Sequence, residues 1–186
     1  MSVQTRSQLV ASAATITSET AAGANTAARV GGLFDDLADT ATLDRERGVA
    51  NLYLDESKSF TPTQGQAVKL TTPLKSGLLS TYNFSRTTTS LTYTGTTSAA
   101  LRISASMVLA QGNGNQIKVY IAKNGTPIEQ SMTDITTTHT NGHAVFTETV
   151  LQGAVNDEFT IYINAIDSGA DITISALSFT VHTLLV

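Results

Sequence analysis

Cysteine is absent from the 186 residues of this chain, so neither a disulfide framework nor a cysteine-ligated metal can stabilise its fold. Charged residues are also scarce, at 14%, and the 11 Lys and Arg residues are scattered along the sequence. With a formal net charge of −4 the sequence offers no basic stripe for phosphates, which argues against a nucleic-acid partner. The 41% of hydrophobic residues suffices for the core of one globular domain.

Signals for membranes and export are missing as well. No apolar run approaches the roughly 18 residues that a membrane-spanning helix needs, so we expect no membrane insertion. The first residues, from Met1 to Arg6, lack the basic and then apolar order of a secretion signal. We therefore expect a protein made without an export signal.

Large apolar side chains are rare in residues 1–24, where Ala, Ser and Thr dominate; they are Leu9, Val10 and Ile16. Such a segment cannot bury enough area to offset its own ordering entropy. Two interpretations remain open: a disordered tail, or an extended arm that becomes ordered when it docks on a larger body. We favour an anchoring arm whose contacts are these three side chains.

A helical pattern is confined to residues 25–48, where Asn25 or Thr26 can cap the first turn. Gly31 and Gly32 each cost about 1 kcal/mol relative to Ala inside a helix. This helix is therefore expected to be stable only when it packs against other helices or against a domain. Identical chains wound about one axis would form a neck; the alternative is a helix packed on its own domain. The apolar positions recur at steps of three and four and are Val30, Leu33, Phe34, Leu37 and Ala41.

From residue 49 onward the apolar period changes from helical spacing to two. Short polar turns such as Lys123-Asn-Gly125 separate the alternating runs, and no helical pattern intervenes. Residues 49–186, the head, are therefore expected to form a mainly β, antiparallel sandwich, with the jelly roll favoured because it carries long strands. A change of parity predicts a bulge near Ala176. The clearest alternating runs are residues 52–54, 101–109, 117–121, 159–163 and 172–181.

Sequence motifs for catalysis are also lacking. There is no Gly-x-Ser-x-Gly elbow, Walker loop or zincin motif in the sequence, and the pair Asp157 and Glu158 is interpreted as solvated charge at a turn rather than as a glycosidase pair. His139 and His143 lie four residues apart, a spacing that places two imidazoles on one face of a helix, where they can bind a metal. Asn141 and Gly142 between them indicate a turn instead, so the spacing does not predict a metal site. We expect no enzyme, no cofactor and no metal.

The longest polar run of the head is residues 133–142. Its hydroxyl and amide groups could hydrogen-bond a sugar, with Tyr120 or Tyr162 as a stacking face. The alternative is an ordinary solvated loop. The candidate ligand residues are Asp134, Thr138, His139, Asn141 and His143.

Four stretches carry a resemblance to a known group of proteins. Residues 25–34, Asn-Thr-Ala-Ala-Arg-Val-Gly-Gly-Leu-Phe, resemble a recurring segment of tailed-bacteriophage virion proteins, particularly fibres and appendages of crAss-like and Bacteroides phages. Residues 89–95, 117–125 and 157–164 are similar to the TNF/C1q-like jelly-roll heads that end many phage fibres.

This resemblance implies a homotrimer with a three-chain helical neck and three heads about the same axis, attached to the virion through its N-terminal part. Trimerisation is then expected to bury the neck positions and head residues on strands 101–109 and 157–164. No extended shaft separates neck from head, which favours a head fibre or capsid-decorating protein over a tail-associated receptor-binding module that contacts a host cell-surface glycan. The expected partners are the capsid or other virion proteins, and the expected location is the virion, after synthesis in the bacterial cytoplasm.

Overall fold

The computed structural model describes residues 48–79, 83–112, 114–138 and 142–184. Several predicted site residues fall elsewhere in the chain, so their assignments stay predictions. The arm positions outside the described residues are Leu9, Val10 and Ile16; the neck positions are Val30, Leu33, Phe34, Leu37 and Ala41; the loop positions are His139 and Asn141.

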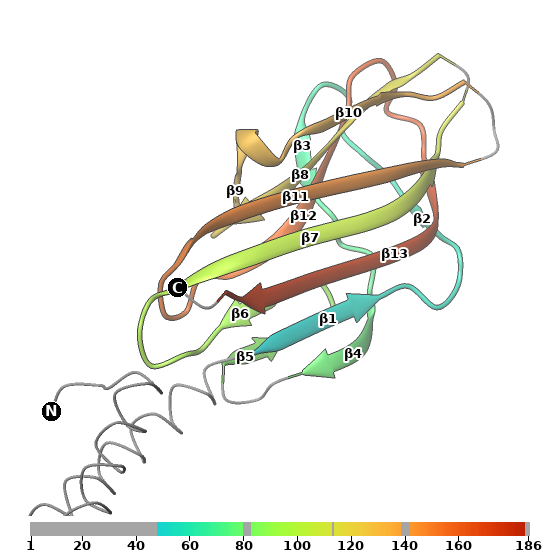
Figure 1. The fold of residues 1–186 in the computed structure, drawn as a ribbon. Coiled ribbons are helices and arrows are strands. Elements are labelled where there is room, and N and C mark those ends of the chain that lie inside the picture. Colours follow the sequence, from blue (N-terminus) through green and yellow to red (C-terminus); the bar gives the residue numbers. More distant parts are fainter. Residues whose placement is uncertain (1–47, 80–82, 113, 139–141, 185–186) are drawn as a thin grey trace, which may run out of the picture. The chain divides into compact units, whose positions relative to one another are not determined.

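The first of two antiparallel sheets, sheet A, has the strand order β11-β7-β13-β1-β4, with β2 also paired to β13. Figure 1 shows β11, β7, β13 and β1 side by side in one layer. The strands are β1 (Val49–Tyr53), β2 (Lys58–Phe60), β4 (Lys75–Leu79), β7 (Ala99–Ala110), β11 (His143–Gly153) and β13 (Ile172–Thr183).

Sheet B packs against sheet A and has the order β10-β8-β12-β6-β5, with β3 paired to β12 and β9 paired to β8. The three head stretches that resemble phage fibre heads supply three neighbouring strands here, because β12 pairs with both β8 and β6. The strands are β3 (Ala67–Lys69), β5 (Phe84–Arg86), β6 (Leu91–Tyr93), β8 (Gln116–Lys123), β9 (Thr126–Pro127), β10 (Thr133–Thr136) and β12 (Glu158–Ala165), and a short 3-10 turn η1 (Glu129–Ser131) precedes β10.

Successive strands of the C-terminal half cross between the sheets. β7 lies in sheet A, β8 to β10 in sheet B, β11 in sheet A, β12 in sheet B and β13 in sheet A. A strand that returns in the opposite layer is the connectivity of a jelly roll rather than of a meander. The predicted mainly β, antiparallel sandwich is therefore confirmed for the described residues.

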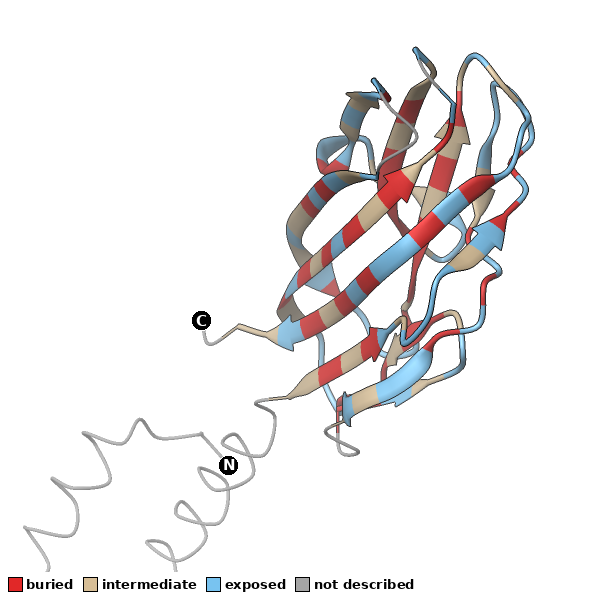
Figure 2. Ribbon diagram, turned by 90° about the vertical axis from the view of Figure 1, so that its right-hand side faces the viewer, coloured by how far each residue is buried: buried red, intermediate tan, exposed pale blue. Residues whose placement is uncertain are grey.

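The core lies between the sheets and follows the predicted alternation, which appears in Figure 2 as bands of buried and accessible residues along the long strands. On β7, Leu101, Ile103 and Ala105 have no exposed surface, and the same holds for Phe159 and Ile163 on β12. The expectation that a trimer interface buries these head residues is wrong, because the sandwich already buries them within one chain.

Two local irregularities match their sequence signals. The pairing of β13 with β7 shifts register between Ile174 and Ala176, which confirms the bulge predicted from the change of parity. At the turn after β8, Asn124 has a φ of 50° and Gly125 a φ of 80°. Positive φ at both central residues is the geometry of a type I′ hairpin turn, which Asn-Gly favours.

Candidate functional site

Sheet A turns one face to the core and presents the other face outward. Alternate residues of a strand point to opposite sides, so the strand register aligns the outward residues of β11, β7, β13 and β1 in rows. Three such rows are Phe146, Ser106, Ser178 and Tyr53; Glu148, Ser104, Thr180 and Asn51; and Val150, Arg102, His182 and Val49. We call this surface the outer A face.

Small hydroxyl side chains form the middle of the outer A face, and larger apolar side chains lie at its edges. On β11, Phe146 is 57% exposed and Val150 is 58% exposed. On the strands of the opposite edge, Tyr53 of β1 is 40% exposed and Leu78 of β4 is 71% exposed. These exposed apolar groups therefore form two separate edges of the face, and each edge is a candidate contact for another protein.

Two polar side chains of this face, Asn51 and Arg102, have hydrogen-bond partners on neighbouring strands. Asn51 Nδ2 donates to Ser178 Oγ at 3.1 Å and to Thr180 Oγ1 at 2.8 Å. Arg102 Nη2 donates to Glu148 Oε2 at 2.6 Å. Polar groups that are already hydrogen-bonded can be covered at a lower cost in desolvation than unpaired ones, so these two positions can be buried in an assembly.

The sequence analysis did not identify the outer A face, although a signal for it exists. Along β11, the apolar doublets Val145-Phe146 and Val150-Leu151 break the alternation. In a half-buried strand only one member of such a doublet can face the core. The other member of each doublet, Phe146 or Val150, faces away from the core and is shielded from water only if another protein surface packs on it.

The predicted ligand residues are only partly brought together. Thr138 N–H donates to Nε2 of His143 at 3.0 Å, which requires that imidazole nitrogen to be unprotonated. Asp134 instead lies on β10, where its Oδ2 accepts a hydrogen bond from Gln116 Nε2 at 2.7 Å. The run 133–142 is therefore not wholly a loop, because residues 133–136 form a strand paired with β8.

The two tyrosines predicted to stack on a sugar are mostly inaccessible to a ligand. Tyr120 and Tyr162 are opposite one another across β8 and β12, but Tyr120 is only 6% exposed. Burial raises the pKa of Tyr120, and the nearby carboxylates of Glu129 and Asp134 raise it further. Tyr162 keeps part of its surface open, so only one of the two rings is accessible to a ligand.

The acidic pair at the start of β12 is bound to lysines rather than solvated. Lys123 Nζ lies 2.6 Å from Oδ2 of Asp157, and Lys69 Nζ lies 3.0 Å from Oε1 of Glu158. Burial raises the pKa of Asp157, but hydrogen bonds from Lys123, the Ala154 backbone and Asn124 together hold it below its ordinary value. The hydrogen bond from Lys69 lowers the pKa of Glu158. Two carboxyls held as anions do not supply the protonated acid that glycoside hydrolysis requires.

The described residues 48–79, 83–112, 114–138 and 142–184 contain neither a metal-ligand cluster nor a membrane-spanning helix. Within those ranges, no group of three or more His, Cys, Asp or Glu side chains is placed to hold a metal ion. In the same residues, no helix has the length and apolar character to cross a membrane.

Comparison with known proteins gives the fold. No family model and no curated protein matches the sequence. The crystal structure of murine APRIL at pH 5.0 is similar, with 11% sequence identity over 74% of this chain and 99% of that chain and a TM-score of 0.53. The PRD1 vertex protein P5 matches 74% of this chain and 97% of its own with 10% identity and a TM-score of 0.49. The similarity to APRIL concerns the fold alone, and it shows that the described residues form a jelly-roll sandwich like that of this neighbour.

Proposed function

We propose that this chain is a non-enzymatic structural protein of a phage virion, a homotrimeric head fibre or capsid-decorating appendage. Its N-terminal arm docks on the capsid through Leu9, Val10 and Ile16, and its helical neck joins the three copies. Its jelly-roll head projects outward. The proposal combines the resemblance of residues 25–34 to phage virion segments with the head, whose outer A face is suited to self-association.

The observation that carries the proposal is the placement of exposed apolar side chains on strands at opposite edges of sheet A. Phe146 and Val150 lie on β11, while Tyr53 and Leu78 lie on β1 and β4. One edge of a copy can therefore cover the other edge of the next copy. Such a head-to-tail contact between unlike patches closes into a ring when the rotation between copies is right.

The neck complements this arrangement. A short helix that contains Gly31 and Gly32 is a weak helix by itself. Three copies about the axis of the head ring would bury the apolar positions from Val30 to Ala41 against one another, and each Å² of apolar surface removed from water contributes about 25 cal/mol. Neck and head then stabilise the same threefold assembly.

The assembly test uses one charge placed on the outer A face. Phe146→Glu puts an ionised carboxylate where the next copy should cover an aromatic ring, and burying an unpaired charge costs several kcal/mol. We expect sedimentation analysis to give three times the 19.5 kDa chain mass for the natural sequence and smaller species for the variant. Val155→Glu is the matched control, because Val155 is 44% exposed but lies in the turn between β11 and β12. A natural chain that is monomeric in solution and in the particle would contradict the proposal.

The virion role is tested on the intact particle. A reconstruction by electron microscopy of the phage that carries this chain should show density of the jelly-roll size on the capsid. Density at the tail tip would favour the receptor-binding module instead. A particle in which the chain is missing would exclude both roles.

A further inference from the structure

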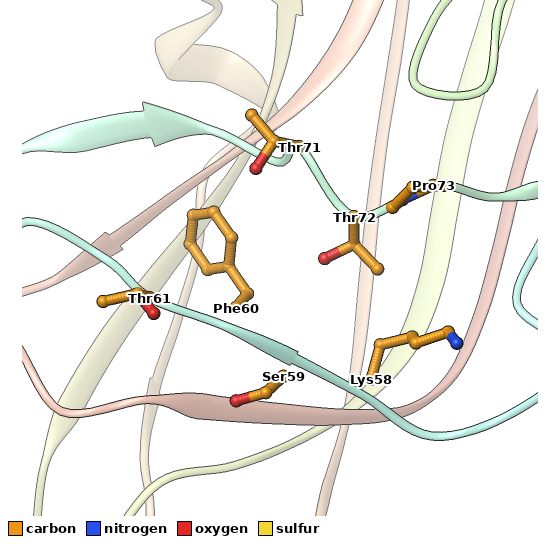
Figure 3. Close-up of a pocket in the computed structure, with 7 residues that line it drawn as sticks. All are labelled: Lys58, Ser59, Phe60, Thr61, Thr71, Thr72 and Pro73. Atoms are coloured by element: carbon orange, nitrogen blue, oxygen red, sulfur yellow. The ribbon is translucent and has the colours of Figure 1, made fainter.

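A pocket of about 340 Å³ lies beside β2, at the segment that leads from β3 to β4. Figure 3 shows its lining side chains, with the Phe60 ring between the two chain segments. The lining is dominated by hydroxyl groups and comprises Lys58, Ser59, Phe60, Thr61, Thr71, Thr72 and Pro73. None of these residues belongs to the outer A face or to the polar run 133–142.

Thr72 is the decisive residue. It is only 6% exposed, yet its hydroxyl makes no hydrogen bond with any residue that the structure describes. Figure 3 shows this oxygen directed toward Phe60, on the pocket side of the chain. The hydroxyl lines the pocket and is not committed to another described residue, so a ligand group that enters the pocket can hydrogen-bond it without breaking a contact within the protein.

The opposite wall presents hydroxyls of fixed orientation. Ser59 Oγ donates to Asp171 Oδ2 at 3.1 Å, and Thr61 Oγ1 donates to Asp171 Oδ1 at 2.6 Å. Because their hydrogens are directed to the carboxylate, their lone pairs remain to accept from a ligand. Thr72 can donate from its own side, so the pocket offers both donors and acceptors.

Charge and apolar surface narrow the class of ligand. Lys58 is already paired with Glu56, and Asp171 adds a further negative charge, so nothing here favours an anion. Pro73 provides exposed apolar surface beside the hydroxyls, while Phe60 is only 4% exposed and closes the inner side of the pocket. The volume is at the lower end of the range for small-molecule sites, about 300–1,000 Å³, which suits one ring rather than a long chain.

From these features we propose that the pocket binds one neutral sugar ring, such as the terminal unit of a glycan. Each sugar hydroxyl both donates and accepts, and the C–H face of the ring packs against apolar side chains. This site is independent of the virion role, because it needs neither the trimer nor the arm.

The test uses the purified full chain and defined sugars. Methyl glycosides of glucose, galactose and mannose, together with N-acetylglucosamine, are titrated against the protein by saturation-transfer and heteronuclear NMR, with N-acetylneuraminic acid as the anionic comparison. We expect saturable binding of at least one neutral sugar, with shift changes concentrated at residues 58–61 and 71–73. Failure of every neutral sugar to saturate, or a preference for the anionic sugar, would overturn the proposal.

Thr72→Val is the diagnostic variant. It keeps the shape of the side chain and removes the hydroxyl that faces the pocket, so we expect unchanged thermal stability together with sugar binding weakened about tenfold. Thr126→Val, at an exposed threonine of β9, is the matched control and should bind as the natural chain does. Equal binding by Thr72→Val would show that the sugar lies elsewhere. The oligomer mass is measured separately, so failure here leaves the trimer test untouched.

Discussion

At the scale of single residues, Asp157 joins the turn between β8 and β9 to the turn between β11 and β12. Its Oδ2 accepts from the Ala154 backbone N–H at 2.6 Å, and its Oδ1 accepts from Asn124 Nδ2 at 2.7 Å. Lys123 adds an ion pair to the same carboxylate. A nearly buried carboxylate with this many donors is held as an anion, so its charge is part of the fold and not a catalytic group.

Asp157→Asn should lower stability in a pH-dependent way. Since the folded-state pKa of Asp157 lies below its ordinary value of 3.8, the carboxylate contributes stability above that value and loses the contribution as the pH falls through the folded-state pKa. We expect the variant to lose about 1–3 kcal/mol at pH 7 through weakened charge-assisted hydrogen bonds, and the difference to shrink below about pH 4. Urea unfolding at pH 7 and pH 3 measures both.

The control for this experiment is Asp55→Asn. Asp55 pairs with Lys75 at 3.5 Å on exposed surface, where an ion pair contributes about 0–1 kcal/mol. An Asp157→Asn effect no larger than the Asp55→Asn effect, or one that is independent of pH, would show that the turns do not depend on the charge.

At the scale of elements, the turn between β8 and β9 requires a left-handed backbone at Gly125. Its φ of 80° is strained for any residue with a Cβ, although an added Cβ would meet only Tyr162 Oη at 3.7 Å. We therefore expect Gly125→Ala to lower the free energy of unfolding by about 1–2 kcal/mol through backbone strain alone. Thermal unfolding should show this as a lower midpoint temperature.

Gly169→Ala is the matched control for that turn. No positive φ is found at Gly169, and the nearest atoms to an added Cβ are 3.8 Å away. Alanine there should leave the thermal midpoint unchanged or raise it slightly, because it restricts the unfolded chain. If both alanines lower the midpoint equally, the left-handed conformation is not the cause.

The long strands could be predicted from sequence because each has one face in the core. On β7 and β13 the inward residues alternate over many positions, and even the bulge near Ala176 appears as a change of parity. Strands such as β2 and β3 have three residues each, which is too short for a period to emerge. Their positions are set by pairing with β13 and β12, a tertiary effect that no local pattern contains.

The candidate sites were harder to predict for a related reason. Phe146 carries a local signal, the apolar doublet of β11, but its partners on the outer A face come from strands about 30 to 90 residues away in sequence. The sugar pocket likewise combines residues 58–61 with 71–73 and orients two hydroxyls through Asp171. The local sequence shows which residues carry hydroxyl groups, but it does not show which of them line the same pocket.

At the scale of the whole molecule, neck and head are expected to associate about one axis, so that each raises the effective concentration of the other. Disrupting one contact should then weaken the assembly without abolishing it. Phe146 tests the head, and Leu37, in the middle of the apolar stripe of the predicted neck, tests the helix.

Leu37→Asp should weaken the trimer by placing a carboxylate among the apolar positions at the axis. We expect a concentration-dependent mass in sedimentation equilibrium for this variant and for Phe146→Glu alone, and a monomer for the two combined, because neither contact then supports the other. Asp39→Ser, on the acidic side of the same predicted helix, is the control and should remain trimeric. A Leu37→Asp chain with the natural mass at every concentration would show that the neck does not hold the copies together and that the head associates alone.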